Sequence, residues 1–223
     1  TRMLSVTREV NRLITTILDS NRLVGDVIEK IQQAFGYYHV QIYLYHPEDD
    51  VLRIAGATGE TGTALIIGQH QLSMSEGLVG RAASTCKPVI VPDVLQDQDW
   101  LSNSLLPDTV SEIAVPIIWE NKVFGVLDVQ HNKPFDPSQN DINILQTVAT
   151  QLGTALSNVK IFQTAQNNLR KELILNEMSL KLQVSPDIQS SIQVVGKNLA
   201  QLVEPVSVKV SIDSELLATE QTA

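Results

Sequence analysis

The stretch SEIAVPIIWENKVFGVLDVQ, residues 111–130, carries the strongest structural signal in the chain. Two apolar runs rich in β-branched residues flank the tripeptide ENK at 120–122, a pattern that predicts a β-hairpin. The second run contains Asp128, which simple alternation places on the same face as Phe124 and Val126. A carboxylate in the middle of a strand needs polar partners. We therefore expect Asp128 to bind loop amides or to point into a pocket.

The segments before this hairpin predict two helices and a second hairpin. Apolar residues at helical spacing indicate helices over 4–18 and from Asp19-Ser20 to Phe35, and Gly36 ends the second helix. Alternation at 37–45 and the run at 51–57 predict two strands joined by a turn. The apolar segment 64–72 predicts a third strand.

A short helix, a short strand and a long loop lead into the central hairpin. Residues 75–88 begin with Ser and stop at Pro, which predicts a helix, and 89–91 predict a strand. Residues 92–109 have no firm period and contain proline near both ends. Loops of this length in a compact domain are usually functional.

A long helix is expected after the hairpin. Asp136 and Pro137 suit the N-cap and the first helical position, and the helical pattern continues to 163 at least, with 183 as its furthest end. Two hairpins imply an antiparallel sheet. The predicted fold class is therefore α+β, with a central antiparallel sheet, helices packed on one face, and long N- and C-terminal flanking helices. The other face would lie under the loops, where a pocket can form.

A seven-residue repeat in the long helix predicts a parallel coiled-coil homodimer through the flanking helices. Packing on the sheet is an open alternative for 145–162. The two series are Leu145, Leu152, Val159, Gln166, Leu173 and Leu180, and Val148, Ala155, Phe162, Leu169 and Asn176.

Residues 178–212 repeat the pattern of 13–44, which is helix, cap, helix and strand, but lack the later strands. We expect four parts: an N-terminal signalling helix at 1–18, a sensor domain at 19–160, a coiled-coil helix at 161–183, and a partial repeat with a tail at 184–223. The tail would dock on its own domain or on a partner subunit.

Composition restricts the function. The net charge of −9 argues against non-specific nucleic-acid binding, which needs Lys and Arg to neutralise phosphates. A lone cysteine, Cys86, excludes an internal disulfide and fits a reducing compartment. No apolar run reaches the ~20 residues of a membrane span. We expect a cytoplasmic location, including the case in which the chain is the soluble part of a membrane-anchored receptor.

Three segments together resemble a GAF domain: EGLVGRAASTCKPVIVPDV at 76–94, the hairpin at 111–130, and FDPSQNDINILQTVATQLGTAL at 135–156. The resemblance covers about 19–160. It implies a central antiparallel sheet with a ligand pocket in front of it, and a regulatory role in a bacterial signal-transduction protein. It also implies dimerisation through flanking helices and coupling to an output domain or partner protein.

Five residues are candidates for ligand binding. Family positions place Arg81 and Glu112 at the border of the pocket, and Asp128 faces it if the strand alternates regularly. Asp93 lies in the 92–109 loop with Asp97 and Asp99, which are expected to solvate a mobile flap. Trp100 is suited to closing over a ligand or to packing under the loop.

Other ligand chemistries have weaker support. The string HNKPFDPSQND at 131–141 has the Asn-Lys and Phe of cyclic-nucleotide GAF domains, but Gln139-Asn140 stand where Asp-Glu is expected. The histidines lack metal-ligand spacing, although haem needs only one axial ligand. Cys86 is expected to be a structural residue rather than a redox or bilin-attachment site. The cofactor is unknown.

The sequence therefore predicts a sensory module that binds an unidentified small molecule and signals through a dimeric coiled coil. The alternative is a ligand-free GAF fold that serves as a dimerising scaffold. A cyclic-nucleotide, haem or redox sensor is less favoured. Catalytic motifs are absent from the sequence, so we do not expect an enzyme.

Overall fold

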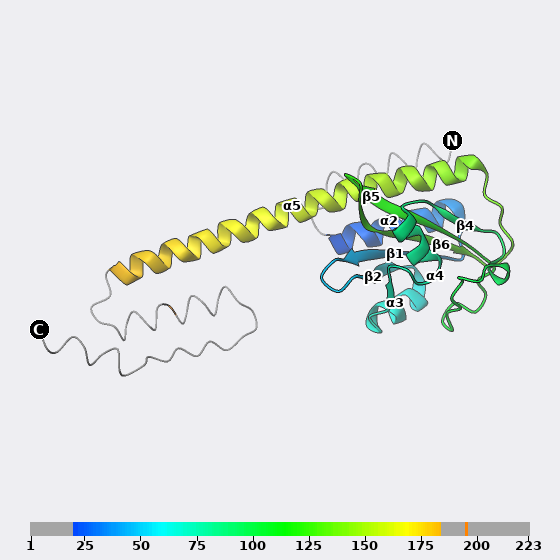
Figure 1. The fold of residues 1–223 in the computed structure, drawn as a ribbon, viewed down its shortest axis with the longest axis horizontal. Helices are drawn as coiled ribbons and strands as arrows, with labels where there is room; N and C mark the ends of the chain where they lie inside the picture. Colours follow the sequence, from blue (N-terminus) through cyan, green and yellow to red (C-terminus); the bar gives the residue numbers. More distant parts are fainter. Residues whose placement is uncertain (1–19, 184–194, 196–223) are drawn as a thin grey trace, which may run out of the picture. The chain divides into compact units, whose positions relative to one another are not determined.

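The computed structural model describes residues 20–183 and Val195. In this part of the chain, six strands form one antiparallel sheet in the order β3-β2-β1-β6-β5-β4 (Figure 1). Spatial clustering divides the chain into two compact units, Thr1–Lys160 and Ile161–Ala223. The elements are α2 (Ser20–Phe35), β1 (His39–His46), β2 (Val51–Ala57), α3 (Gly59–Ile67), β3 (Gln71–Ser73), α4 (Gly77–Thr85), β4 (Val89–Val91), the 3-10 helix η1 (Val94–Gln96), β5 (Ser111–Trp119), β6 (Lys122–His131) and α5 (Gln139–Gln183).

Helix α2 and the first half of α5 pack on one face of the sheet, as predicted (Figure 1). Their apolar residues recur at helical spacing, whereas the strand residues that meet them alternate. This confirms the α+β class and the antiparallel sheet. The core on this face includes Leu23, Val24, Val27, Ile28 and Ile31 of α2, Val40 and Ile42 of β1, Ile113, Val115 and Ile117 of β5, Leu127 and Val129 of β6, and Leu145, Val148 and Leu152 of α5.

The opposite face is covered by α4 as well as by loops. Val79, Ala82 and Ala83 of α4 pack against Tyr43 and Val126 of the sheet. Two adjacent alanines let the helix approach the strands closely. The sequence pattern predicted α4 but did not reveal that it lies on this face.

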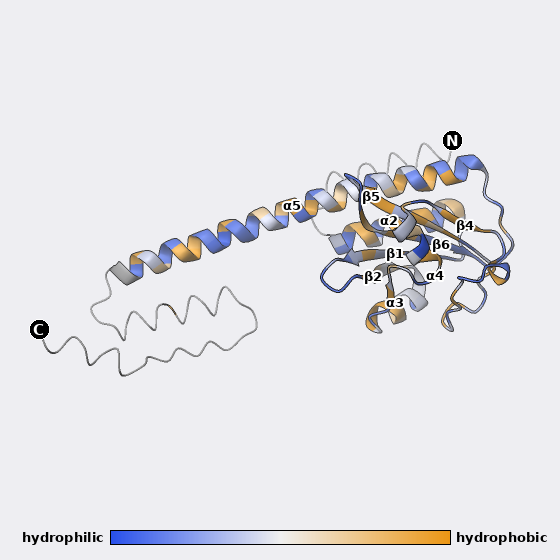
Figure 2. Cartoon of the chain, in the orientation of Figure 1, coloured by the Kyte–Doolittle hydropathy of each residue, from blue (hydrophilic) through white to orange (hydrophobic). Residues whose placement is uncertain are grey.

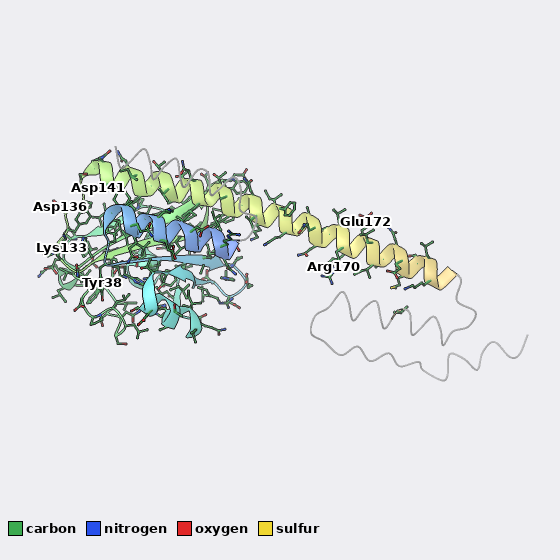
Figure 3. All side chains as sticks on the ribbon, turned by 180° about the vertical axis from the view of Figure 1, so that it is seen from behind. Tyr38, Lys133, Asp136, Asp141, Arg170 and Glu172 are labelled. Atoms are coloured by element: carbon green, nitrogen blue, oxygen red, sulfur yellow. The ribbon has the colours of Figure 1, made fainter. Side chains whose placement is uncertain are left out.

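Two predictions about local structure are wrong. The expected strand at 64–72 is helix α3 followed by the short strand β3. A four-residue apolar run fits either structure, and here only Leu65 is buried while Ile67 is 77 % exposed. The N-cap of α5 is Ser138, not Asp136: Ser138 Oγ accepts from the Asp141 N–H (3.3 Å), and the Ser138 N–H donates to the Asp141 carboxylate (3.1 Å). This reciprocal capping starts the helix two residues later than expected; Asp136 and Asp141 are labelled at this end in Figure 3.

Helix α5 changes its surroundings along its length. The heptad residues Leu145 to Val159 are buried, so this half packs on the sheet. In the second unit, bands of apolar and polar residues continue along α5 (Figure 2), and Leu169, Leu173 and Leu180 are exposed. The predicted helix at 4–18 lies outside the described residues, as does the predicted repeat at 184–223 apart from Val195. No helix in the described part combines the length and apolarity needed to cross a bilayer.

Candidate ligand-binding site

Four polar side chains project from the sheet face that α4 and the loops cover. Gln41 on β1 lies opposite Asp128 on β6, and Gln130 on β6 lies opposite Glu112 on β5. All four are buried, and Asp128 is 0 % exposed. Strand alternation places them on the same face as Val126, which contacts α4 in the second core. The site is therefore built on three adjacent strands in the middle of the sheet.

These side chains form one buried hydrogen-bond network. Asp128 Oδ2 accepts from Gln41 Nε2 and from Gln130 Nε2, both at 2.8 Å. Gln130 Oε1 accepts from the hydroxyl of Thr109 at 2.7 Å. Asp128 also hydrogen-bonds to Glu112, and Gln41 to His39. Buried polar groups are hydrogen-bonded in folded proteins, and this network meets that requirement.

Burial also changes the proton affinity of the two carboxyls. It raises the pKa of Asp128 to about 6, although hydrogen bonds involving Gln130, Gln41 and Glu112 act in the opposite direction. The pKa of Glu112 is raised well above its ordinary value by burial and then by the charge of Asp128. At neutral pH, we therefore expect Glu112 to carry a proton and Asp128 to be ionised.

A cavity of about 410 Å³ opens above these groups. Gln41, Glu112 and Gln130 lie along its floor, and the loop 101–104 and the start of α4 form its other walls. The Tyr43 hydroxyl lies 3.1 Å from His70 Nδ1 at one side. The volume is within the range typical of small-molecule sites. Its lining residues are Gln41, Tyr43, His70, Gln71, Leu72, Glu76, Gly77, Leu78, Val79, Leu101, Ser102, Asn103, Ser104, Glu112 and Gln130.

Of the five predicted site residues, only Glu112 lines this cavity. Asp128 is buried against Gln41 and Gln130, and the other three lie elsewhere. The Arg81 guanidinium donates two hydrogen bonds to Asp97 (2.7 and 3.1 Å) and one to Asp99 (2.7 Å). Asp93 accepts from the Leu95 N–H and so caps η1. Asp93 and Trp100 line a different cavity, of about 540 Å³.

Arg81 therefore fastens the loop to α4 rather than lining the pocket. Trp100 follows the two aspartates and packs against Leu78 and Val94. A hydrogen bond from Trp100 lowers the pKa of Glu112 in part, which ties the loop to the floor of the cavity. The ion pairs of Arg81 with Asp97 and Asp99, together with the Trp100 indole, hold the loop at the edge of the cavity.

One assumption about β6 needs correction. Phe124 does not share the face of Val126 and Asp128, because it packs in the α2/α5 core and contacts Lys160 of α5. The strand pairing explains this: Ile117 pairs with Gly125, but Ile118 pairs with Val123, so Phe124 is an extra residue in a β-bulge.

Sequence reasoning missed Gln41, Gln130, Tyr43 and His70. The available signal was two glutamines at alternating positions within strands, each on the same face as a candidate residue. Alternation alone does not tell which of the polar residues line a cavity. Other motifs considered lie outside the cavity. Phe135 meets the ring of Tyr37 edge-on and lies tilted against His131. Cys86 ends α4 in the left-handed region at φ 53°.

Comparison with known proteins agrees with this architecture. The family model described as "GAF domain" matches residues 18–157. The Nif-specific regulatory protein of Azospirillum lipoferum is 26% identical over 170 residues, which are 73% of this chain and 26% of that protein. Its counterpart in Azospirillum brasilense is 26% identical over 153 residues, 65% of this chain and 24% of that protein. The chain thus spans about a quarter of the length of these curated relatives.

Two solved structures show the same fold. The GAF domain of an Acinetobacter phosphoenolpyruvate-protein phosphotransferase aligns with a TM-score of 0.65 at 21% identity, covering 74% of this chain and 98% of that one. The free methionine-R-sulfoxide reductase of Neisseria meningitidis, in complex with its substrate, aligns with a TM-score of 0.63 at 22% identity. The alignment covers 71% of this chain and 90% of that one. The fold thus occurs both as a domain of a phosphotransferase and as a sulfoxide reductase. With the family match covering more than half of its residues, this chain belongs to the GAF domain family.

Proposed function

We propose that the chain is a sensory module of a bacterial signal-transduction protein and that it binds a small molecule in the 410 Å³ cavity. The observation that carries the proposal is the lining of this cavity, in which the buried polar side chains of Gln41, Glu112 and Gln130 face an open volume. A scaffold with no ligand gains nothing from such groups, because apolar side chains in their place would be more stable. The similarity to Nif-specific regulatory proteins supports a regulatory role.

We propose that the cavity binds its ligand without catalysing a reaction. Among the solved neighbours are free methionine-R-sulfoxide reductases, so the fold alone does not decide the matter. The residues that line the cavity here include no cysteine and no Lys, and the one histidine, His70, is paired with Tyr43. That set suits recognition through hydrogen bonds better than nucleophilic chemistry.

The signal would pass from the floor of the cavity to α5. Asp128 lies on β6, and the same strand leads through 132–138 into α5. Leu127 and Val129, which flank Asp128, belong to the core that also holds Leu145 and Leu152 of α5. A ligand that binds two arrangements of this core with different affinity would shift the balance between them. We propose that the exposed leucines of α5 form a homodimer seam that carries this shift to an output domain or partner protein.

Native mass spectrometry of the freshly purified chain tests the proposal, because it reports a co-purified ligand and the dimer together. Hydrogen exchange with and without the ligand should show protection at 101–104 and at the start of α5. A ligand-free spectrum, together with no compound in a metabolite panel that protects 101–104, would contradict the sensory role. A monomer at high concentration would contradict the dimer seam.

A further inference from the structure

The floor of the cavity is poorly accessible. Gln41, Glu112 and Gln130 line the cavity, yet at most 7 % of each residue is exposed. Val79 of α4 also lines it and is 4 % exposed. A small molecule can therefore contact these groups over a large area only if a wall of the cavity moves. The wall at 101–104 belongs to the long loop between β4 and β5.

Residues 95–105, called the lid from here on, lie between two fixed points. Val94 before them is fully buried, and its N–H donates to the Val110 carbonyl (2.9 Å). Leu106 after them is 3 % exposed, and the Val110 N–H donates to the end of β6 (2.8 Å). Most residues of the lid itself are exposed. A segment with few buried groups between two anchored ends can open without unfolding the domain.

Two turns within the lid keep its shape. In the first, the Asp97 carboxylate accepts from the Asp99 N–H (3.0 Å), and the Asp97 carbonyl accepts from the Trp100 N–H (3.3 Å). In the second, the Asn103 side chain accepts from the Leu105 N–H (2.9 Å). These bonds join lid residues to one another, so they can persist when the lid moves as a unit.

A cluster of ion pairs joins the lid to α4. The Arg81 guanidinium donates to both carboxylate oxygens of Asp97, at 2.7 and 3.1 Å, and to Asp99 at 2.7 Å. The Arg81 side chain is 33 % exposed and that of Asp99 is 59 % exposed, so water and salt reach these pairs. The pairs therefore favour the closed lid but can break and re-form.

Two further contacts hold the lid over the cavity. Trp100 packs against Leu78 of α4 and hydrogen-bonds to Glu112 on the floor. The Leu101 side chain lies on Gly77 at the start of α4, where an added Cβ would come within 3.1 Å of it. The lid must give up both contacts to expose the floor.

We propose that the lid gates the cavity and that Arg81 is the positioning residue that keeps it closed. A ligand enters or leaves when the ion pairs to Asp97 and Asp99 break and the lid turns away from α4. A ligand that contacts both the floor and the wall at 101–104 favours the closed lid. The inference rests on the proposed function only in naming what passes the lid, because the movement takes place with or without a ligand.

Cysteine labelling measures the opening of the lid. Val79→Cys places a thiol on the cavity wall of a chain whose exposed native thiol is removed by Cys86→Ser, and iodoacetamide reacts with it when the lid opens. Ala83→Cys is the matched control, because Ala83 lies on the same helix, is 1 % exposed and does not line the cavity. Its thiol reacts only when α4 itself unfolds. Iodoacetamide is uncharged, so salt does not alter its encounter with either thiol.

Arg81→Gln should accelerate labelling at position 79 about three- to fivefold, as expected for partly exposed ion pairs, and leave position 83 unchanged. Asp97→Asn should act in the same direction, because asparagine keeps the oxygen that accepts from the Asp99 N–H and removes only the charge. The double variant should label at the rate of Arg81→Gln, which already breaks the pair. Raising the salt from about 0.05 to about 0.5 M should accelerate labelling only where Arg81 is present.

Equal labelling at position 79 in all these chains would overturn the inference, as would an equal acceleration at position 83. An acceleration by Asp108→Asn would do the same, since this exposed change of equal charge lies outside the lid. If Val79→Cys fails to fold, hydrogen exchange at 97–104 in the Arg81→Gln and Asp97→Asn chains replaces the labelling, and rates equal to wild type would contradict the lid.

The lid and the sensory function fail separately. The labelling uses no ligand, so an empty native mass spectrum contradicts the sensory function and leaves the lid intact. Protection of 101–104 by a ligand, together with labelling rates that do not depend on Arg81, would contradict the gate and leave the sensory function standing.

Discussion

Replacing Asp128 by asparagine should make the protein more stable at neutral pH, and increasingly so as the pH rises. In the folded chain the pKa of Asp128 is about 6, against an ordinary 3.8. A carboxyl whose pKa is raised by folding contributes its full stability below pH 4 and loses it as the pH rises through 6. The loss approaches about 3 kcal/mol at 1.36 kcal/mol for each pH unit between the two values.

The size of the effect in an accessible pH range follows from the same two values. Between pH 5 and pH 7, the Asp128 cost grows by about 1.3 kcal/mol. The asparagine side chain of the variant has no charge to desolvate, and its oxygen can still accept from the neighbouring amides. Glu112 acts in the same direction, because its raised pKa depends partly on Asp128.

His39 hides this trend in the wild-type protein. Burial lowers the pKa of His39 to about 4, so the stability that its neutral form contributes is lost as the pH falls below 6.5. Between pH 4 and 6.5, His39 makes the unfolding free energy rise with pH, whereas Asp128 makes it fall. The His39 contribution cancels in the difference in unfolding free energy between Asp128→Asn and wild type, so this difference reports the carboxyl alone.

Urea unfolding followed by circular dichroism at pH 5, 6, 7 and 8 measures this difference, with Asp108→Asn as the exposed control. We expect the advantage of Asp128→Asn to increase by about 1–1.5 kcal/mol from pH 5 to pH 7. A difference that stays constant over this range, or that shrinks with rising pH, would refute the assignment of a buried, ionised Asp128.

Four further outcomes are expected. Arg81→Gln should remove the ion pairs with Asp97 and Asp99 and free the loop, which hydrogen exchange would record as faster exchange at 97–104. Less than about 1 kcal/mol of stability should be lost, since the guanidinium is partly exposed. Gly153→Val should destabilise by about 1–3 kcal/mol in thermal melts, because a Cβ at Gly153 would lie 2.7 Å from the carbonyl oxygen of Ile118. Ser138→Ala removes the N-cap of α5 and should cost about 1 kcal/mol in urea unfolding, whereas Ser138→Asp should restore it. Leu173→Glu, at a position that is 70 % exposed, should dissociate the proposed dimer in light scattering without lowering the melting temperature of residues 20–160.

The parts of the fold that the sequence predicted are the long, strongly periodic ones. The 111–130 hairpin and the long helix after it each repeat a clear pattern over many residues, so local and tertiary preferences agree. Helix α3 was missed because the apolar run within it is too short to show a period. The start of α5 was misplaced because Asp136-Pro137 and Ser138 with Asp141 both offer a cap, and only the folded backbone selects between them.

The site was predictable only in part, for a different reason. Glu112 and Asp128 were noticed because a charge within an apolar strand is conspicuous. Gln41 and Gln130 were not, because a strand with alternating polar residues has the same pattern whether its polar face meets water or a covered cavity. The placement of α4 and of the loop above that face decides between the two, and this is a tertiary property.

The bulge at Phe124 separates the two ends of β6. Beyond the bulge, β6 pairs with both β1 and β5, and this fixes the face on which Val126, Asp128 and Gln130 lie. Before the bulge, Lys122 and Val123 pair with β5 alone. Only glycine is accommodated at position 125, because a Cβ there would lie 2.0 Å from the carbonyl oxygen of Tyr43. The tip of the hairpin can therefore gain or lose residues without turning Asp128 away from Gln41 and Gln130. Length variation in relatives is expected at 119–124, and the acidic floor should be aligned by counting from Gly125 rather than from the turn.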